Sequence, residues 1–93
     1  MFDRILSQMR NRIRTRQYIM TIHAEEEMDD DDLTILDVES VVLTGTIVER
    51  QKDATMGEWK YLVRGKTLGG DSAAGVGRLG RTGKLIFITV YRD

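Results

Sequence analysis

The last ten residues, 84–93, constrain the fold of this chain more than any other segment. From Leu85 to Val90 every side chain is apolar or β-branched, and no charge interrupts the run. Such a run is typical of a strand that is buried on both faces and therefore lies inside a sheet rather than at its edge. It ends in Tyr91 and Arg92, which we expect at the surface as candidates for polar chemistry.

The length and composition set the class of protein. The chain has 93 residues, so we expect one domain over 1–93. It has no cysteine, which excludes disulfides, zinc-thiolate sites and thiol nucleophiles. No apolar run approaches the roughly 20 residues of a membrane span, and the N-terminus lacks the apolar core of a signal peptide. These features predict a cytoplasmic protein that does not enter a membrane.

Helical periodicity occupies the first half of the chain. Apolar side chains at helical spacing predict a basic first helix within residues 1–17. Thr21 is a predicted N-cap for a second helix over about 22–30. The aspartates at 29–32 are expected to end this helix, through mutual repulsion and poor helix propensity.

A third helix is predicted after Thr34. Asp37 stands three residues beyond this N-cap, at the position of a weak capping box. Gly45 is expected to stop the helix in the left-handed conformation. After Gly45 the hydrophobic pattern changes to a period of two, which indicates strands.

Four strands are predicted, over 46–52, 58–66, 72–79 and the C-terminal run. We expect a turn over 53–57 and a bulge or close backbone approach at Gly75 and Gly77. Residues 17–22 fit either a short strand or an extended link. Helices followed by strands predict an α+β fold, with N-terminal helices packed on one face of an antiparallel sheet of about four strands.

Charge is segregated along the chain, although the net charge is only −1. Residues 1–16 hold five arginines and one acid, residues 17–49 hold ten acids and no Lys or Arg, and residues 50–93 hold nine basic and four acidic residues. Each block fits a solvated surface. The basic blocks also fit contact with a polyanion such as RNA, or with an acidic partner protein.

His23 is the only histidine, in the first turn of the second predicted helix. An imidazole exchanges protons near neutral pH, so His23 is a candidate general acid or base. The alternative is a structural residue that bonds the neighbouring sheet. The acids that follow lack the glycine and ligand spacing of a calcium loop, so no metal site and no cofactor are expected.

The predicted strands carry basic residues that would form a concave cationic surface near Tyr61, Trp59 or Tyr91 if several of them share a face. Basic side chains on a sheet can hold a phosphodiester and stabilise its transition state. The alternative is ordinary solvent-facing charge on a sheet with one covered side. The residues are Arg50, Lys52, Lys60, Arg64, Lys66 and Arg78.

The chain resembles a bacterial family of unknown function, domain-of-unknown-function family 4258. The resemblance spans about residues 18–91 and leaves the first helix outside. Thr21-Ile22-His23-Ala24 and Ile88-Thr89-Val90-Tyr91 are its most specific parts. Segments 37–41, 50–53 and 60–65 are similar as well. Where many members have basic residues around the methionine of the second helix, this chain has Glu27 and the aspartate run, a departure that weakens RNA binding there.

The resemblance carries no established activity, but the layout is similar to that of RelE-like ribonuclease toxins. It implies a toxin-like, metal-independent RNA-cleaving or RNA-binding domain. His23, Arg64 and Tyr91 would be catalytic. Phosphate would be held by basic residues of the sheet, namely Lys60, Lys52, Arg50 and Arg78. The alternative is a non-catalytic module that docks an acidic or antitoxin-like protein, or a second copy of the chain, through its acidic helices or basic first helix.

Overall fold

The computed structural model describes residues 1–52, 54 and 57–93. Its elements follow the predicted order of helices and then strands, with one additional strand. They are α1 (Asp3–Arg14), β1 (Tyr18–Met20), α2 (Ile22–Asp30), α3 (Ile35–Thr44), β2 (Thr46–Lys52), β3 (Trp59–Lys66), β4 (Ser72–Leu79) and β5 (Leu85–Arg92). The α+β class is confirmed. The turn expected over 53–57 includes positions 53, 55 and 56, which lie outside the described residues.

The sheet has five strands in the order β1-β5-β4-β3-β2, not the four that were expected. The additional strand is β1, which pairs in parallel with β5, while all other neighbours are antiparallel. The chain leaves α1 beside the first residues of β5, so Gln17 and Thr21 can bond its backbone at Leu85 and Phe87. A segment that fitted either a strand or a link therefore becomes a strand because β5 offers it a partner.

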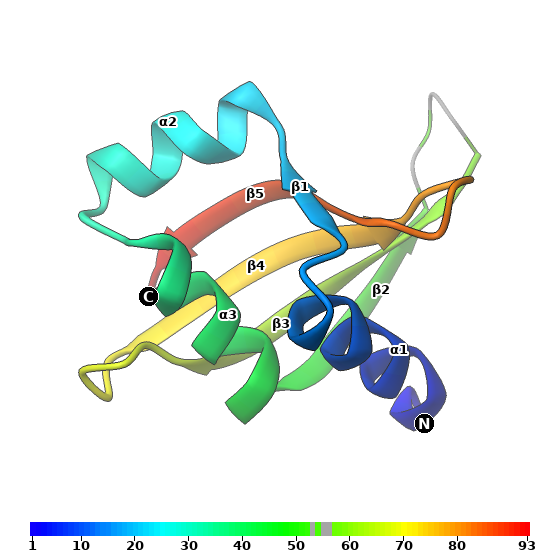
Figure 1. Ribbon diagram of the computed structural model, residues 1–93, viewed down its shortest axis with the longest axis horizontal. Coiled ribbons are helices and arrows are strands. Elements are labelled where there is room, and N and C mark those ends of the chain that lie inside the picture. The colour runs from blue at the N-terminus through cyan, green and yellow to red at the C-terminus, as the bar shows by residue number, and fades with distance from the viewer. Residues whose placement is uncertain (53, 55–56) are drawn as a thin grey trace.

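Helices α1 and α3 lie side by side on one face of the sheet, and α2 runs along β5 (Figure 1). We call this the covered face. Its core combines helix residues such as Met9 and Val41 with strand residues such as Val63 and Phe87, each at most 2% exposed. None of the helices in the described part of the chain is long and apolar enough to span a membrane.

The predicted helix caps are present. The Thr21 hydroxyl accepts a hydrogen bond from the Ala24 amide, and Thr34 and Asp37 form both halves of a capping box. Helix α2 ends at Asp30 within the aspartate run, as predicted. Asp32 adopts a left-handed φ of 54°, and the Leu33 amide bonds the Met28 carbonyl at 2.8 Å. The pattern is a Schellman motif with Met28 and Leu33 both buried, so local backbone geometry ends the helix.

Gly45 is not left-handed, which corrects the prediction, because its φ is −95°. Its role is close approach. A Cβ at Gly45 would lie 2.2 Å from the Arg64 carbonyl oxygen, and one at Gly65 would lie 2.2 Å from the Val41 oxygen. The end of α3 therefore rests directly on the backbone of β3, which only paired glycines permit.

Candidate functional site

The other face of the sheet, which we call the open face, has no helix over it in the described structure. A strip of Leu62, Ala74 and Val76 runs along it, bordered by Ile88 and Tyr91. Its basic residues are Lys60, Arg64 and Lys66 on β3 and Arg78 on β4, as the register with their partners shows. The open face thus combines a narrow apolar centre with cations at both ends.

Arg64 and Tyr91, two of the predicted catalytic residues, are neighbours on the open face. Both are register partners of Ala74 on β4, one from each side. The Arg64 Nε donates to the Asp93 Oδ2 at 2.8 Å. The Asp93 carboxylate raises the pKa of the Arg64 guanidinium, and the Tyr91 hydroxyl acts in the same direction. Arg64 is thus a half-exposed cation beside a phenol, held in place by a carboxylate.

Tyr91 reaches the open face because of a bulge in β5. Phe87 is opposite Gly77 and Thr89 is opposite Val76, so Ile88 is an additional residue in the strand. Phe87 and Val90 both point to the covered face as a result. Strict alternation would have placed Tyr91 with Phe87 under the helices. The register shift lies opposite Val76 and Gly77, near the predicted position, but the additional residue is in β5 and not in the glycine-bearing strand β4. This bulge sets the direction of Tyr91.

A second bulge divides the predicted RNA-binding residues between the two faces. On β2, Ile47 is opposite Val63 and Glu49 is opposite Leu62, which leaves Val48 without a register partner. Beyond this point Arg50 is opposite Tyr61 and Lys52 is opposite Trp59, both on the covered face. Without the bulge, Arg50 would be opposite Lys60 on the open face. The open face therefore carries Lys60, Arg64, Lys66 and Arg78, whereas Arg50 and Lys52 lie on the covered face.

Arg50 and Lys52 gather around Trp59 instead. The Arg50 guanidinium carbon lies 3.9 Å from the centre of the indole ring, and the Lys52 ammonium lies 5.7 Å from it. At the same end of the sheet, Arg78 donates to the Glu58 Oε2 at 2.8 Å on the open face. Basic side chains thus lie on both faces at this end of the sheet. Arg50 and Lys52 are on the covered face, and Arg78 is on the open face.

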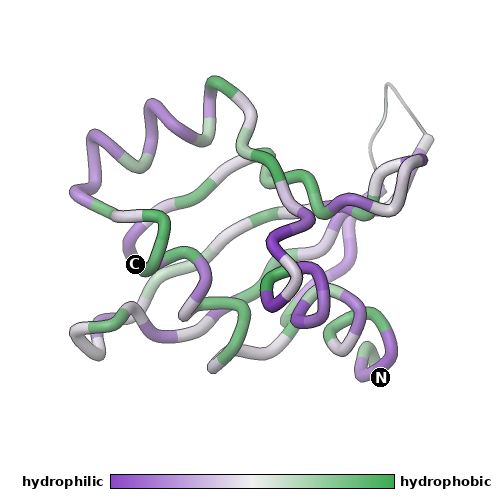
Figure 2. The backbone as a smooth tube through the Cα atoms, viewed as in Figure 1, coloured by the Kyte–Doolittle hydropathy of each residue, from purple (hydrophilic) through white to green (hydrophobic). Residues whose placement is uncertain are grey.

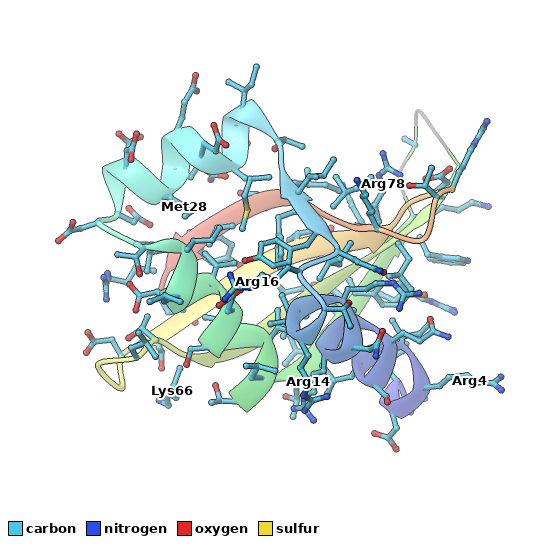
Figure 3. All side chains as sticks on the ribbon, viewed as in Figure 1. Arg4, Arg14, Arg16, Met28, Lys66 and Arg78 are labelled. Atoms are coloured by element: carbon cyan, nitrogen blue, oxygen red, sulfur yellow. The ribbon has the colours of Figure 1, made fainter. Side chains whose placement is uncertain are left out.

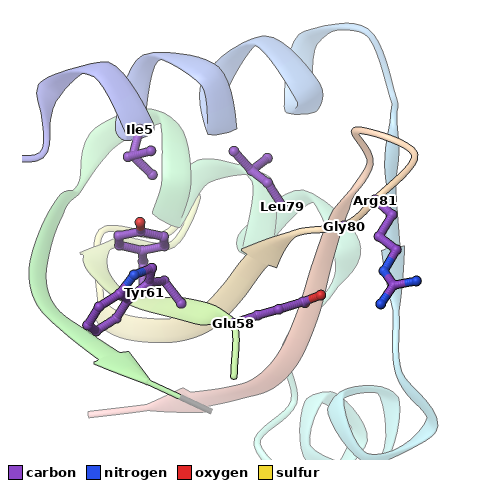
Figure 4. Close-up of a pocket in the computed structure, with 7 residues that line it drawn as sticks. Ile5, Glu58, Tyr61, Leu79, Gly80 and Arg81 are labelled. Carbon is purple, nitrogen blue, oxygen red and sulfur yellow. The ribbon is translucent and has the colours of Figure 1, made fainter. Parts of the chain in front are cut away.

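A cleft of about 390 Å³ opens beside Trp59, between α1 and the ends of β3 and β4. We call it the Trp59 cleft. Figure 4 shows Ile5 and Leu79 above Tyr61, with Glu58 and Arg81 on the other side. Its lining residues are Ile5, Glu58, Trp59, Tyr61, Leu79, Gly80 and Arg81.

His23 is not part of the Arg64–Tyr91 pair. Its side chain is 67% exposed, and its Nε2 lies 3.2 Å from the Glu27 Oε1. The same carboxylate oxygen accepts from the Thr89 hydroxyl and from the Val90 amide. The structure therefore joins His23 through Glu27 to the edge of β5, while Tyr91 points to the open face. Its catalytic role stays a prediction.

The acidic residues of α2 have a structural role that the sequence analysis missed. Glu27 accepts the Val90 amide at 3.2 Å and Asp31 accepts the Arg92 amide at 2.8 Å, while the Thr21 hydroxyl donates to the Ile88 carbonyl. These bonds satisfy the edge of β5 beyond the end of β1. The spacing of four between Glu27 and Asp31 was the available clue. Figure 2 shows that hydrophilic residues predominate along α2.

Arg92 is also structural. Its guanidinium donates to the carbonyls of Asp31 and Asp32 and to the Asp71 carboxylate. A cation at the C-terminal end of α2 satisfies free carbonyl groups and complements the helix dipole. Arg92 thus anchors α2 to β5.

Two of the five arginines near the N-terminus also cap backbone groups. Arg10 donates to the carbonyls of Val42 and Gly45 at the end of α3, and Arg12 donates to the Gly83 carbonyl in the β4–β5 turn. Arg4, Arg14 and Arg16 are exposed (Figure 3). The basic surface of α1 is consequently smaller than the sequence indicates.

Among residues 1–52, 54 and 57–93, histidine, aspartate and glutamate side chains form no group of three or more suited to a metal ion. The model of a protein family, described as Domain of unknown function (DUF4258), matches residues 20–92. Neither a curated protein nor a solved structure matches the chain. The family match begins after α1 and includes every strand of the described sheet from β2 to β5.

Proposed function

This chain belongs to the DUF4258 family of domains of unknown function, and we propose that it is a toxin-like domain that binds single-stranded RNA on its open face. The observation that carries the proposal is the juxtaposition of Arg64 and Tyr91 beside an apolar strip. A guanidinium binds phosphate through two parallel hydrogen bonds. A phenol ring and apolar side chains contact bases without regard to sequence.

Lys60 and Arg78 extend the cationic surface to the other end of β3 and β4. Asp93 and Glu58 hold Arg64 and Arg78 in place, so a phosphate binds by displacing these carboxylates or by sharing the two guanidinium groups with them. Cations that bind phosphate make affinity fall as salt rises. We therefore expect weak, salt-dependent binding with little sequence preference.

Cleavage requires a group that moves a proton beside the bound phosphate. Tyr91 and Asp93 are next to Arg64, whereas His23 is paired with Glu27 at the edge of β5. The function that the geometry supports best is therefore binding. Cleavage by His23, Arg64 and Tyr91 stays a hypothesis that the same assay tests.

The experiment uses a fluorescent single-stranded RNA of about a dozen nucleotides, with anisotropy to measure binding and a denaturing gel to measure cleavage. We expect Arg64→Ala to weaken binding about tenfold, the loss of one charge-assisted contact. Arg14→Ala, an exposed arginine on α1, serves as the matched control. RNA binding that is absent, or equal in both variants, would refute the proposal. Cleavage abolished by His23→Ala would support the catalytic hypothesis.

A second candidate function, docking of a protein partner, is favoured by one apolar groove. Leu36, Leu43 and Leu68 line a groove of about 280 Å³ beside α3, and Leu68 is 67% exposed. Exposed apolar surface of this kind is typical of interaction sites. Light scattering on the wild type and on Leu36→Glu tests whether a second copy of the chain occupies it. Monomers in both samples would leave a different protein as the partner.

A further inference from the structure

The Trp59 cleft has the composition of a ligand site. Trp59 is 43% exposed, although indole is among the side chains that gain most from burial. It lines a cleft whose other apolar walls are Ile5, Tyr61 and Leu79. An exposed aromatic ring at the mouth of an apolar concavity is a surface on which another flat ring can stack.

Two kinds of ligand suit a tryptophan–tyrosine wall. Quaternary ammonium groups bind in aromatic cages, and nucleobases stack on aromatic rings. The charges around the cleft decide between them. Arg50 and Lys52 are within 3.9 and 5.7 Å of the Trp59 ring centre, and Arg81 lines the cleft. Among the described residues that line the cleft, Glu58 is the one acid, and it is paired with Arg78. These three cations would repel a cationic ligand and attract an anionic one.

From this arrangement we infer that the Trp59 cleft binds a single nucleotide, with its base against Trp59 and Tyr61 and its phosphate near Arg50, Lys52 and Arg81. The inference deepens the proposed function on which it rests, because the nucleotide would be one unit of the bound RNA strand. A volume of about 390 Å³ lies at the small end of the range for ligand pockets, about 300–1,000 Å³. It therefore suits one nucleotide better than two.

The position of Glu58 connects the cleft with the open face. Glu58 lines the cleft, and its carboxylate accepts from Arg78, which belongs to the open face. A strand of RNA that leaves Arg64 and Tyr91 toward Lys60 and Arg78 consequently arrives at the end of the sheet where the cleft opens. The open face would hold the backbone, and the cleft would hold one base.

The chain itself supplies the probe, since Trp59 is its only tryptophan. We would titrate the whole protein with AMP, GMP, CMP and UMP and follow tryptophan fluorescence. Ribose 5-phosphate and inorganic phosphate are the controls without a base, and tetramethylammonium tests the aromatic-cage alternative. We expect at least one nucleotide to quench Trp59 at concentrations where all three controls do not. Equal quenching by ribose 5-phosphate, or quenching by tetramethylammonium alone, would overturn the inference.

Variants separate the cleft from the open face. We expect Arg81→Ala to weaken nucleotide binding about fivefold to tenfold, with Arg14→Ala unchanged. Trp59→Leu, measured by calorimetry because it lacks the fluorophore, should lose between fivefold and a hundredfold in affinity. Circular dichroism checks that both variants are folded.

The RNA-binding assay distinguishes failure of the inference about the Trp59 cleft from failure of the proposed function. If RNA binding depends on Arg64 but not on Trp59, the inference about the cleft is wrong and the proposed function stands. If nucleotides bind the cleft and the wild type does not bind RNA, the nucleotide site is supported and its place in RNA recognition is refuted.

Discussion

The two faces of the sheet differ in what shields their apolar residues. On the covered face, Leu85, Phe87 and Val90 are at most 1% exposed beneath side chains from the helices. On the open face, Leu62 and Val76 are 8% and 6% exposed although no helix of the described structure covers them. Their shield consists of their own neighbours on the sheet, Ile88 and Tyr91.

This difference separates stability from recognition. Packing among three helices and the sheet makes the covered face the main source of folding free energy, since apolar burial dominates stability. The open face has a smaller buried cluster and leaves the Arg64 side chain half-exposed. Substitutions on the covered face should therefore mainly lower the free energy of unfolding. Substitutions on the open face should mainly weaken binding.

The largest effect is expected from Phe87→Ala, compared with Ile88→Ala at the next position of β5. Phe87 is 1% exposed and packs edge-on against Tyr18, with 5.9 Å between the two ring centres. Its truncation should cost about 3–5 kcal/mol of unfolding free energy. Ile88 is partly exposed on the open face, so its truncation should cost only about 1–2 kcal/mol. Urea denaturation measures both. Equal losses would contradict the comparison between the faces.

Glu27→Ala tests the border between the faces, where α2 covers the edge of β5. It leaves the Val90 amide and Thr89 hydroxyl without the acceptor that they share. We expect a loss of about 1–3 kcal/mol. Glu26→Ala, an exposed acid on the same helix, is the control and should change little. A similar loss in both variants would contradict a specific role of Glu27 at the edge of β5.

Tyr18 provides a pH-dependent test of the covered face. Burial, together with its hydrogen bond to Glu39, raises the pKa of Tyr18 from 10.0 to about 12. Its stabilisation is therefore complete below pH 10, the pKa in the unfolded chain, and is lost as the pH rises through about 12. Tyr18→Phe should cost about 1 kcal/mol at pH 7. The difference from the wild type should shrink between pH 10 and 12, as thermal denaturation at several pH values would show. A constant difference would contradict the raised pKa.

The smallest effect on stability is expected from Arg64→Ala. Its side chain is half-exposed on the open face, and its ion pair with Asp93 is solvent-accessible. Solvent screens pairs of this kind, so urea denaturation should show little or no change in the midpoint. The same variant should lose RNA affinity. A large loss of stability would show that the open face is structural after all.

Local patterns in the sequence determined much of this protein. Thr21 and Thr34 cap their helices as predicted, because capping depends on residues three positions away. Hydrophobic periodicity likewise depends on residues that are near in the sequence, and it predicted the order of helices and strands. The unbroken run of β5 correctly indicated a strand inside the sheet, between β1 and β4. Its open-face residues are only partly buried, which the run alone did not reveal.

The tertiary structure alone decided which residues meet. The bulge at Ile88 turns Tyr91 toward Arg64, and the bulge at Val48 turns Arg50 and Lys52 away from it. One additional residue in a strand reverses the face of every residue after it. The hydrophobic pattern of a single strand does not specify at which residue a bulge will occur when the strand pairs. The sequence thus supplied the cations and the tyrosine, and strand pairing assigned them to the open face or to the Trp59 cleft.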